Sequence, residues 1–208
     1  MYIPDHFRER HHADTIAFMQ ANPFAIVISA SPEGPFATHA PLSIHAGGDR
    51  VVLRGHVAKA NPHWKYLEQN PQCLTIFHGA HAYISPSNYV IHESVPTWNY
   101  GAVHVYGEAR LFSSPEELLP MLHELIGTFE ASYAERWATF SEEYRHRMLS
   151  HIVGFEILAS RVEGKFKLSQ NRTKQEQANV ISSLESASDS TVSGVAQMMR
   201  HQGLGNKE

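Results

Sequence analysis

The chain has 208 residues, of which 42% are hydrophobic and 18% are charged, a composition typical of globular rather than disordered proteins. Its formal net charge is -4 with all 15 histidines neutral. Since DNA-binding proteins neutralise phosphates with an excess of positive charge, direct DNA binding would need a local basic patch or a further partner. The single cysteine, Cys73, excludes an internal disulfide and a cysteine-based zinc site.

The length suits one domain with a sizeable core. The N-terminal residues contain no apolar segment of the kind found in a secretory signal. No apolar run reaches the roughly 20 residues that span a bilayer. Together with the lone cysteine, these features predict a cytoplasmic protein with no membrane segment. The histidines are spread from His6 to His201, which favours solvated surface side chains over a metal site.

The predicted elements begin with a helix over residues 13–21, which Asn22 and Pro23 end. A short helix over 61–69 is also predicted, with Asn61 as its N-cap and Pro62 as its first residue. Short apolar runs between turn signals, including turns at 31–35 and 47–49, indicate an antiparallel meander. The predicted strands are 24–29, 36–44, 51–56, 73–77, 81–84 and 99–112, with a loop over 85–97.

The second half of the chain alternates less regularly. Residues Ser114 to Glu117 read as a capping box with Pro115 at the first helical position, and apolar residues at helical spacing follow. A helix over 142–150 and a strand over 152–158 come next. Beyond residue 171 the chain is polar, with a predicted helix over 173–184 and one or two helical turns over 195–200 before a frayed end.

These elements predict a mainly β fold with flanking helices, of the α+β class. A meander of six or seven strands closes most easily into a barrel, which removes exposed edges, although an open sheet covered by helices fits the pattern equally well. The predicted organisation is a single domain over residues 1–170, followed by a helical and partly flexible tail over 171–208.

Several nucleotide, hydrolase and metal motifs are absent. The sequence has no P-loop, no Gly-x-Gly-x-x-Gly after a strand and no Gly-x-Ser-x-Gly elbow. The pairs beginning at His92 and His123 lack the second histidine of a zinc protease. His78 and His81 are more typical of structural histidines than of metal ligands. No residue stands out as a catalytic acid or base.

Polar residues interrupt the predicted strand around Thr38 and His39. A flat ring system can stack beside such a strand and accept hydrogen bonds from these two side chains. The alternative is a half-buried strand whose polar face meets solvent.

Basic and amide side chains gather at the end of the next strand. The strand carries Arg54 and His56, a turn places Lys59, and Asn61 caps the following helix. Cations beside free helical N–H groups favour an anion such as a phosphate. The alternative is an ordinary helix cap with exposed basic residues.

Two large aromatic residues, Trp98 and Tyr100, flank Asn99 at the start of the long predicted strand. Aromatic side chains in this arrangement suit the cover of a planar ligand or a dimer interface, and core packing is the plain alternative.

A fourth cluster lies near the end of the last strand. In an extended chain Lys165, Lys167 and Ser169 share one face, and Gln170 and Asn171 add groups that donate and accept hydrogen bonds. The cluster suits a phosphate or the edge of a ring, or else it is an edge strand protected by lysines.

Together these segments resemble the PaiB family of FMN-binding negative transcriptional regulators. The resemblance is carried, in family order, by residues 1–4 with His6 and Phe7, by Thr38-His39-Ala40-Pro41, Gly55-His56-Val57-Ala58-Lys59-Ala60-Asn61-Pro62 and His81-Ala82-Tyr83-Ile84-Ser85-Pro86-Ser87, and by Val95-Pro96-Thr97-Trp98-Asn99-Tyr100 and Lys167-Leu168-Ser169-Gln170-Asn171-Arg172.

The resemblance implies a split β-barrel like that of pyridoxamine-phosphate-oxidase-type flavoproteins. It implies a homodimer with FMN at the subunit interface. By position, Thr38 and His39 would line the ring, and His56, Lys59 and Asn61 would lie near the phosphate or ribityl chain. Lys167, Ser169, Gln170 and Asn171 would close the site. Arg54 and Trp98 complete the predicted cofactor-binding set.

Three features depart from the family pattern. Lys59 stands where arginine is more usual, which keeps the charge but loses the bidentate contact. Asn88 stands where tryptophan is usual, and the loop over 88–95 is shorter. The last two changes affect a segment that would cover the ligand.

The resemblance predicts a negative transcriptional regulator or flavin sensor, with DNA as a partner that the charge pattern itself does not support. One alternative is a flavin-dependent oxidoreductase acting on a small molecule, in which the protein positions the ring and tunes it by hydrogen bonds. Another is a haem-binding or haem-degrading split-barrel protein, which the histidines permit.

Overall fold

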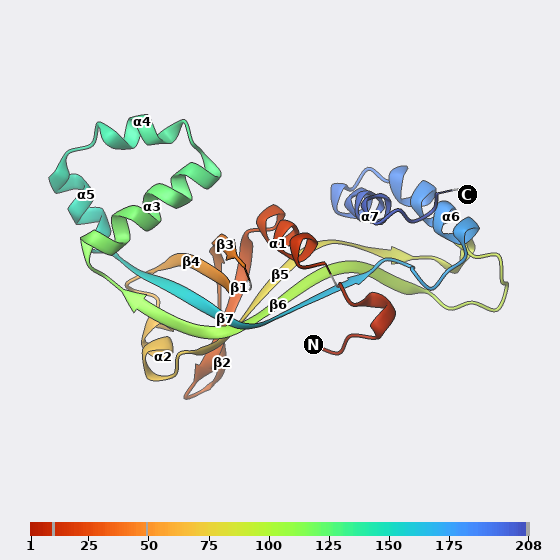
Figure 1. Ribbon diagram of the computed structural model, residues 1–208, viewed down its shortest axis with the longest axis horizontal. Helices are drawn as coiled ribbons and strands as arrows, with labels where there is room; N and C mark the ends of the chain where they lie inside the picture. Colours follow the sequence, from red (N-terminus) through yellow and green to blue (C-terminus); the bar gives the residue numbers. More distant parts are fainter. Residues whose placement is uncertain (10, 49, 207–208) are drawn as a thin grey trace. The chain divides into compact units, whose positions relative to one another are not determined.

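The computed structural model describes residues 1–9, 11–48 and 50–206 of the chain (Figure 1). Seven strands form an antiparallel sheet in the order β2-β1-β5-β6-β7-β4-β3. The strands are β1 (Phe24–Ser31), β2 (Gly34–Pro41), β3 (Ser43–Gly47), β4 (Arg50–Ala58), β5 (Gln72–Ile84), β6 (Thr97–Phe112) and β7 (Ile152–Lys167). The predicted turn at 47–49 includes Asp49, which lies outside the described residues.

Short helices flank the strands, as the mainly β prediction with helices on the outside requires. They are η1 (Asp5–Phe7), α1 (His12–Ala21), α2 (His63–Gln69), η2 (Pro86–Asn88), α3 (Pro115–Phe129), α4 (Tyr133–Ala138), α5 (Glu142–Leu149), α6 (Lys174–Glu185) and α7 (Ser190–His201). In the part of the chain that the structure describes, no helix is both long and apolar enough to cross a membrane.

The chain divides into two compact units. The first unit comprises Met1–Thr15, His78–Val103 and Glu163–Glu208, and the second comprises Ile16–Phe77 and His104–Val162. Strands β5, β6 and β7 contribute residues to both units. The predicted domain over residues 1–170 with a tail over 171–208 stays a prediction; the C-terminal helices belong to the first of these two units, together with earlier segments.

The core of the second unit follows the alternation of its strands. In the pairing of β4 with β7, Leu53 lies opposite Ile157, and both side chains are fully buried together with Phe155. Helices α3, α4 and α5 follow one another in a lobe beyond β6 (Figure 1). This lobe has its own apolar cluster, made of Phe112, Leu118, Met121, Leu125 and Leu149.

The first unit packs its two C-terminal helices side by side (Figure 1). Helix α6 begins at a capping box between Thr173 and Glu176. Helix α7 begins at Asp189, whose side chain accepts a hydrogen bond from the backbone of Thr191. The two helices contribute six buried apolar side chains to the core of this unit: Val180, Ile181, Leu184, Val195, Ala196 and Met199. The last helix is therefore longer than the one or two turns predicted.

The strand predicted over 36–44 is in fact two strands, β2 and β3, that separate at Leu42. Pro41 has no N–H to donate to a ladder. The backbone N–H of Leu42 donates to the carbonyl of Pro23 at 2.9 Å instead of to a strand. The chain therefore leaves β1, the partner of β2, and continues along β4, the partner of β3.

The structure differs from the predicted secondary structure at three further places. The strands predicted over 73–77 and 81–84 are one strand, β5, because Gly79 and Ala80 stay extended. Helix α4 was not predicted. The hydroxyl of Ser114 donates to the Glu117 carboxylate at 3.2 Å and does not cap the backbone of α3, so the predicted capping box is wrong while the helix is confirmed.

Candidate functional site

The predicted cofactor-binding residues fall into two sets, one in each unit. Thr38, His39, Arg54, His56, Lys59 and Asn61 belong to the second unit, and Trp98, Lys167, Ser169, Gln170 and Asn171 belong to the first.

A buried histidine organises the set in the second unit. The hydroxyl of Thr38 lies 2.8 Å from Nδ1 of His63 and 3.2 Å from Nδ2 of Asn61, which donates to it. Nε2 of His63 lies 3.0 Å from the hydroxyl of Ser29. The side-chain carbonyl of Asn61 accepts a hydrogen bond from the backbone of His63 at 3.0 Å. The imidazole thus ties β1, β2 and the start of α2 together.

Burial determines the charge of this histidine. The side chain of His63 is 1% exposed, and desolvation lowers the pKa of its imidazole below the ordinary value. The ring is therefore neutral at pH 7, with one nitrogen donating and the other accepting. The hydroxyls of Ser29 and Thr38 serve either role, so both ring nitrogens are satisfied.

The end of β4 presents a cation next to this cluster. Lys59 is exposed, and no carboxylate pairs with its ammonium among the described residues. Its backbone is fixed at both ends, since its N–H donates to His151 at 2.7 Å and its carbonyl accepts from the Trp64 indole at 3.0 Å. His39 is exposed on β2 and stacks on Phe24, with ring centres 5.9 Å apart.

His56 carries an unused hydrogen-bonding group. Its Nδ1 is buried and has no partner among the described residues. Burial lowers the pKa of the imidazole. Because buried polar groups almost always have a partner, this nitrogen is a group that a ligand at the end of β4 would satisfy.

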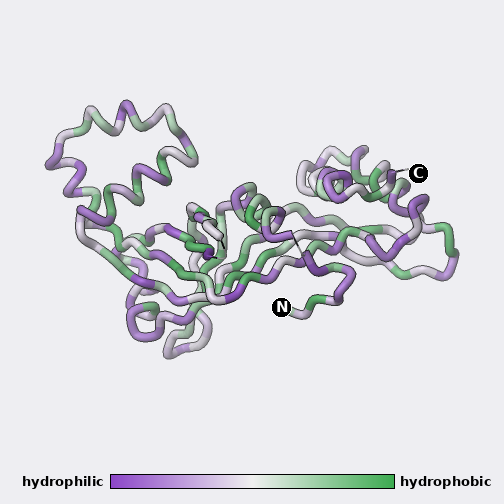
Figure 2. The backbone as a smooth tube through the Cα atoms, in the orientation of Figure 1, coloured by the Kyte–Doolittle hydropathy of each residue, from purple (hydrophilic) through white to green (hydrophobic). Residues whose placement is uncertain are grey.

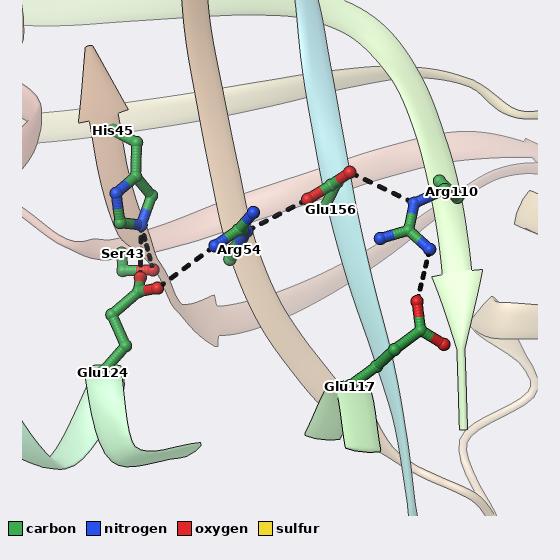
Figure 3. Close-up of polar contacts among 7 residues, drawn as sticks. All are labelled: Ser43, His45, Arg54, Arg110, Glu117, Glu124 and Glu156. Atoms are coloured by element: carbon green, nitrogen blue, oxygen red, sulfur yellow. Dashed lines mark hydrogen bonds and ion pairs between the residues drawn. The ribbon is translucent and has the colours of Figure 1, made fainter. Parts of the chain in front are cut away.

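Arg54 is engaged in an ion-pair network on the other part of β4 (Figure 3). Its guanidinium donates to Glu156 at 3.0 Å and to Glu124 at 3.4 Å. Arg110 donates to the same Glu156 at 3.1 Å and to Glu117 at 2.7 Å. The network fastens α3 to strands β4, β6 and β7. The positive charge of Arg54 is therefore balanced by the protein itself.

The network predicts a loss of stability in acid. Burial raises the pKa of Glu156, but hydrogen bonds from Arg110 and Arg54 outweigh it, so the net shift is downward. A lowered pKa contributes stability above the ordinary pKa that is lost as the pH falls through the folded value. Glu156→Gln should therefore lower the free energy of unfolding by about 1 kcal/mol at pH 7, and by less at pH 4, in urea titrations. Glu33→Gln, in an exposed turn, is the control; an equal loss at both pH values would contradict the prediction.

Three residues of the set in the first unit, Lys167, Ser169 and Asn171, line a cavity of about 210 Å³. The other polar residues of its lining are His6, Tyr89, Thr97, Asn99 and Arg172. The amide of buried Asn99 donates to the hydroxyl of Ser169 at 2.9 Å. Ser169 has a φ of 64°, a left-handed conformation that is uncommon outside glycine. The structure thus brings Lys167, Ser169 and Asn171 together.

The two remaining predicted residues of the first unit have other surroundings. The side chain of Gln170 accepts from the backbone of Leu168 at 2.7 Å and donates to the carbonyl of Phe166 at 2.5 Å, so it holds the turn after β7. Trp98 is 53% exposed and its ring lies 6.1 Å from those of His81 and Tyr83. Trp98 therefore belongs to a surface and not to the cavity.

Several residues at these two places were not predicted. His63 and Ser29 complete the buried cluster, and Tyr89 and Arg172 line the cavity. Arg172 is the last residue of a motif that carries the family resemblance, and the resemblance implies no role for it. His63 is the first residue of α2, and its backbone N–H donates to the side chain of Asn61. Its place two residues after a predicted cofactor-binding residue is the signal that could have identified it as part of the cluster.

Comparison with known proteins places the chain. Residues 1–161 match the family model described as "Putative FMN-binding domain". The chain belongs to this family. It is 35% identical over 201 residues to the Protease synthase and sporulation protein PAI 2 of Bacillus subtilis, covering 96% of each chain. It is 31% identical to an uncharacterised protein of Emericella nidulans, covering 81% of this chain and 80% of that one. The predicted resemblance is confirmed.

Solved structures support the fold of this FMN-binding family member. The flavocytochrome Anf3 from Azotobacter vinelandii matches with a TM-score of 0.60 and 18% identity, over 77% of this chain and 69% of that one. The FAD and haem binding protein from Mycobacterium smegmatis matches with a TM-score of 0.61 and 11% identity, over 77% and 73%. The predicted split-barrel fold is thereby confirmed. The match to the FMN-binding family model confirms FMN as the predicted cofactor.

Proposed function

We propose that the protein is an FMN-binding homodimer of the PaiB type that acts as a negative regulator of transcription and senses flavin. The observation that carries this proposal is the 35% identity to the Bacillus subtilis protein over 96% of both chains, since a likeness of that extent includes every segment of the two residue sets. The geometry at the end of β4 supports the flavin part.

The end of β4 fits the phosphate and ribityl end of FMN. Lys59 supplies an ammonium with no carboxylate partner among the described residues, and Asn61 and Thr38 supply an amide and a hydroxyl that are already oriented by His63. The unpartnered Nδ1 of His56 adds one further hydrogen-bonding group. A phosphate carries close to two negative charges and several acceptor oxygens, which match this set. Exposed His39 suits the ring face. Bound there, FMN would supply its own redox chemistry.

Exposed apolar side chains in the first unit support the dimer. The exposed fractions are 53% for Tyr83, 70% for Val90, 62% for Ile91, 73% for Val95 and 53% for Trp98. Within the loop between β5 and β6 a hydrophobic stretch is followed by a hydrophilic one (Figure 2). Gathered apolar surface of this kind marks association sites. Sedimentation equilibrium should give twice the chain mass, and a monomer with full FMN occupancy would overturn this part of the proposal.

Lys59→Ala tests the flavin site. Loss of a charge-assisted contact to phosphate costs about 1.5–3 kcal/mol of binding free energy. The dissociation constant for FMN should therefore rise roughly 10- to 100-fold. A fluorescence titration of flavin-free protein with FMN measures it. The matched control is Lys65→Ala, an exposed lysine on α2 that removes the same charge. Equal affinity of the Lys59→Ala variant and the unchanged protein would remove Lys59 from the site.

Regulation is tested separately from flavin binding. We expect the FMN-loaded protein to retain a subset of genomic fragments, with binding that weakens steeply as salt rises, and to oxidise NAD(P)H no faster than free FMN. Rapid NAD(P)H oxidation without DNA retention would instead establish a flavin-dependent oxidoreductase. A Soret band on haem addition that His56→Ala or His39→Ala abolishes would establish a haem protein.

A further inference from the structure

The cavity of the first unit is strongly cationic. It is lined by the side chains of Lys167 and Arg172, and no lining residue is a carboxylate. All of its lining residues belong to the first unit. Two positive charges on the wall of one small cavity repel each other, and a bound anion would relieve that repulsion.

Lys167 lacks a counter-ion. Its ammonium contacts the hydroxyl of Thr97 and lies 5.8 Å from the centre of the Phe7 ring. The side chain is half-buried, and no carboxylate reaches it among the described residues. A partly buried charge without an opposite charge is costly, so the ammonium is placed to receive an anion.

Arg172 is held by an aromatic ring and makes no salt bridge among the described residues. The central carbon of its guanidinium lies 3.8 Å from the centre of the Tyr89 ring, a stacked arrangement that orients its N–H fork. The nearby carboxylate of Glu176 accepts from the backbone of Val90 at 3.1 Å and of Thr173 at 3.2 Å. Both oxygens of Glu176 accept from main-chain donors, and its charge interacts with that of Arg172 without a direct contact. The guanidinium itself donates no hydrogen bond within the described part of the chain.

Two further features are typical of a built site. Tyr89 lines the cavity, and its buried hydroxyl has no hydrogen-bond partner among the described residues. Ser169 holds its left-handed backbone through a hydroxyl bonded to Asn99. Unpartnered buried polar groups and strained backbone both concentrate at functional sites.

We propose that this cavity binds the oxyanion group, a carboxylate or a phosphate, of a small ligand distinct from the FMN cofactor. Arginine offers a planar fork that matches either group, and lysine adds a point charge. A cavity of about 210 Å³ is smaller than the roughly 300–1,000 Å³ typical of whole-ligand pockets, so it suits the anionic head of a molecule whose remainder stays outside. The claim of distinctness rests on the proposed flavin site at Lys59.

The test titrates the full-length protein with inorganic phosphate and with acetate, while amide resonances of residues 169–172 are followed by NMR. Both anions should shift these resonances saturably, whereas chloride at equal ionic strength should not. Lys167→Met and Arg172→Gln should each weaken the affinity at least tenfold. Lys174→Gln, an exposed lysine on α6, should leave it unchanged. No saturable shift, or equal affinity in all variants, would overturn the proposal.

Repeating the titration with FMN bound shows whether the cavity receives the phosphate of FMN or the anionic group of another ligand. If FMN abolishes phosphate binding, or if Arg172→Gln releases FMN while Lys59→Ala does not, the cavity belongs to the flavin and the proposal is overturned. If Lys59→Ala leaves FMN affinity unchanged but the cavity still binds phosphate in FMN-loaded protein, the flavin site proposed at Lys59 fails and the anion site stands.

Discussion

The His63→Phe variant is expected to lose about 2 kcal/mol of stability and most of its affinity for FMN. Phenylalanine fills a similar space but removes both ring nitrogens, so the buried hydroxyl of Ser29 keeps only the carbonyl of Ala30 at 3.4 Å and Thr38 keeps only Asn61. Stranding buried polar groups costs roughly 1–3 kcal/mol each. Because Thr38 and Asn61 then lose their fixed orientation, the flavin contacts weaken with them.

A double-mutant cycle separates these two effects. Ser29→Ala removes one partner of His63 at the far side of the ring, and unfolding free energies of both single variants and the double variant give the coupling. FMN titration of each variant gives the effect on the ligand. We expect Ser29→Ala to cost stability but little affinity. If His63→Phe binds FMN as tightly as the unchanged protein, His63 has no positioning role.

The Gly107→Ala variant is expected to lose about 3 kcal/mol of unfolding free energy, more than Gly154→Ala or Gly127→Ala. An added Cβ at Gly107 would lie 2.4 Å from the carbonyl oxygen of Leu158 on the neighbouring strand. A backbone atom cannot rotate away as a side chain does, so β6 and β7 must separate locally. Gly154→Ala brings a Cβ to 2.3 Å of the Phe112 ring, and there the ring can shift.

Gly127→Ala is the matched control for this prediction. Gly127 is exposed in α3 and nothing lies within 4 Å of an added Cβ, so alanine should stabilise the helix by about 0.5–1 kcal/mol. Thermal and urea unfolding of the three variants should give opposite signs for Gly107→Ala and Gly127→Ala. A neutral Gly107→Ala would mean that the strands tolerate the added methyl group.

Sequence predicted the elements whose signals are local. The helix ended by Asn22-Pro23, the hairpin turn before β2 and the helix after Thr173 all depend on residues within one or two turns of each other. The family resemblance depended on short uninterrupted motifs, and it supplied the split barrel and FMN that periodicity alone left open between a barrel and an open sheet.

The side-chain partnerships could not be predicted in this way. His63 meets Ser29, which is 34 residues away, and Arg54 meets Glu156, which is 102 residues away. No local pattern reveals that Arg54 pairs with carboxylates within the fold, and its predicted place at the cofactor stays a prediction. In the same way, the stacking of Arg172 on Tyr89 joins segments far apart in the chain.

The strands β5, β6 and β7 pass from one unit into the other without any intervening linker. Most multi-unit chains can melt one part while the other persists, because a flexible connector isolates them. Here β5, β6 and β7 each run through both units, so we expect local unfolding that starts in one unit to spread along these strands into the other. The chain should consequently exchange its central amide hydrogens with deuterium as one cooperative block, and partial proteolysis should yield no independently folded half.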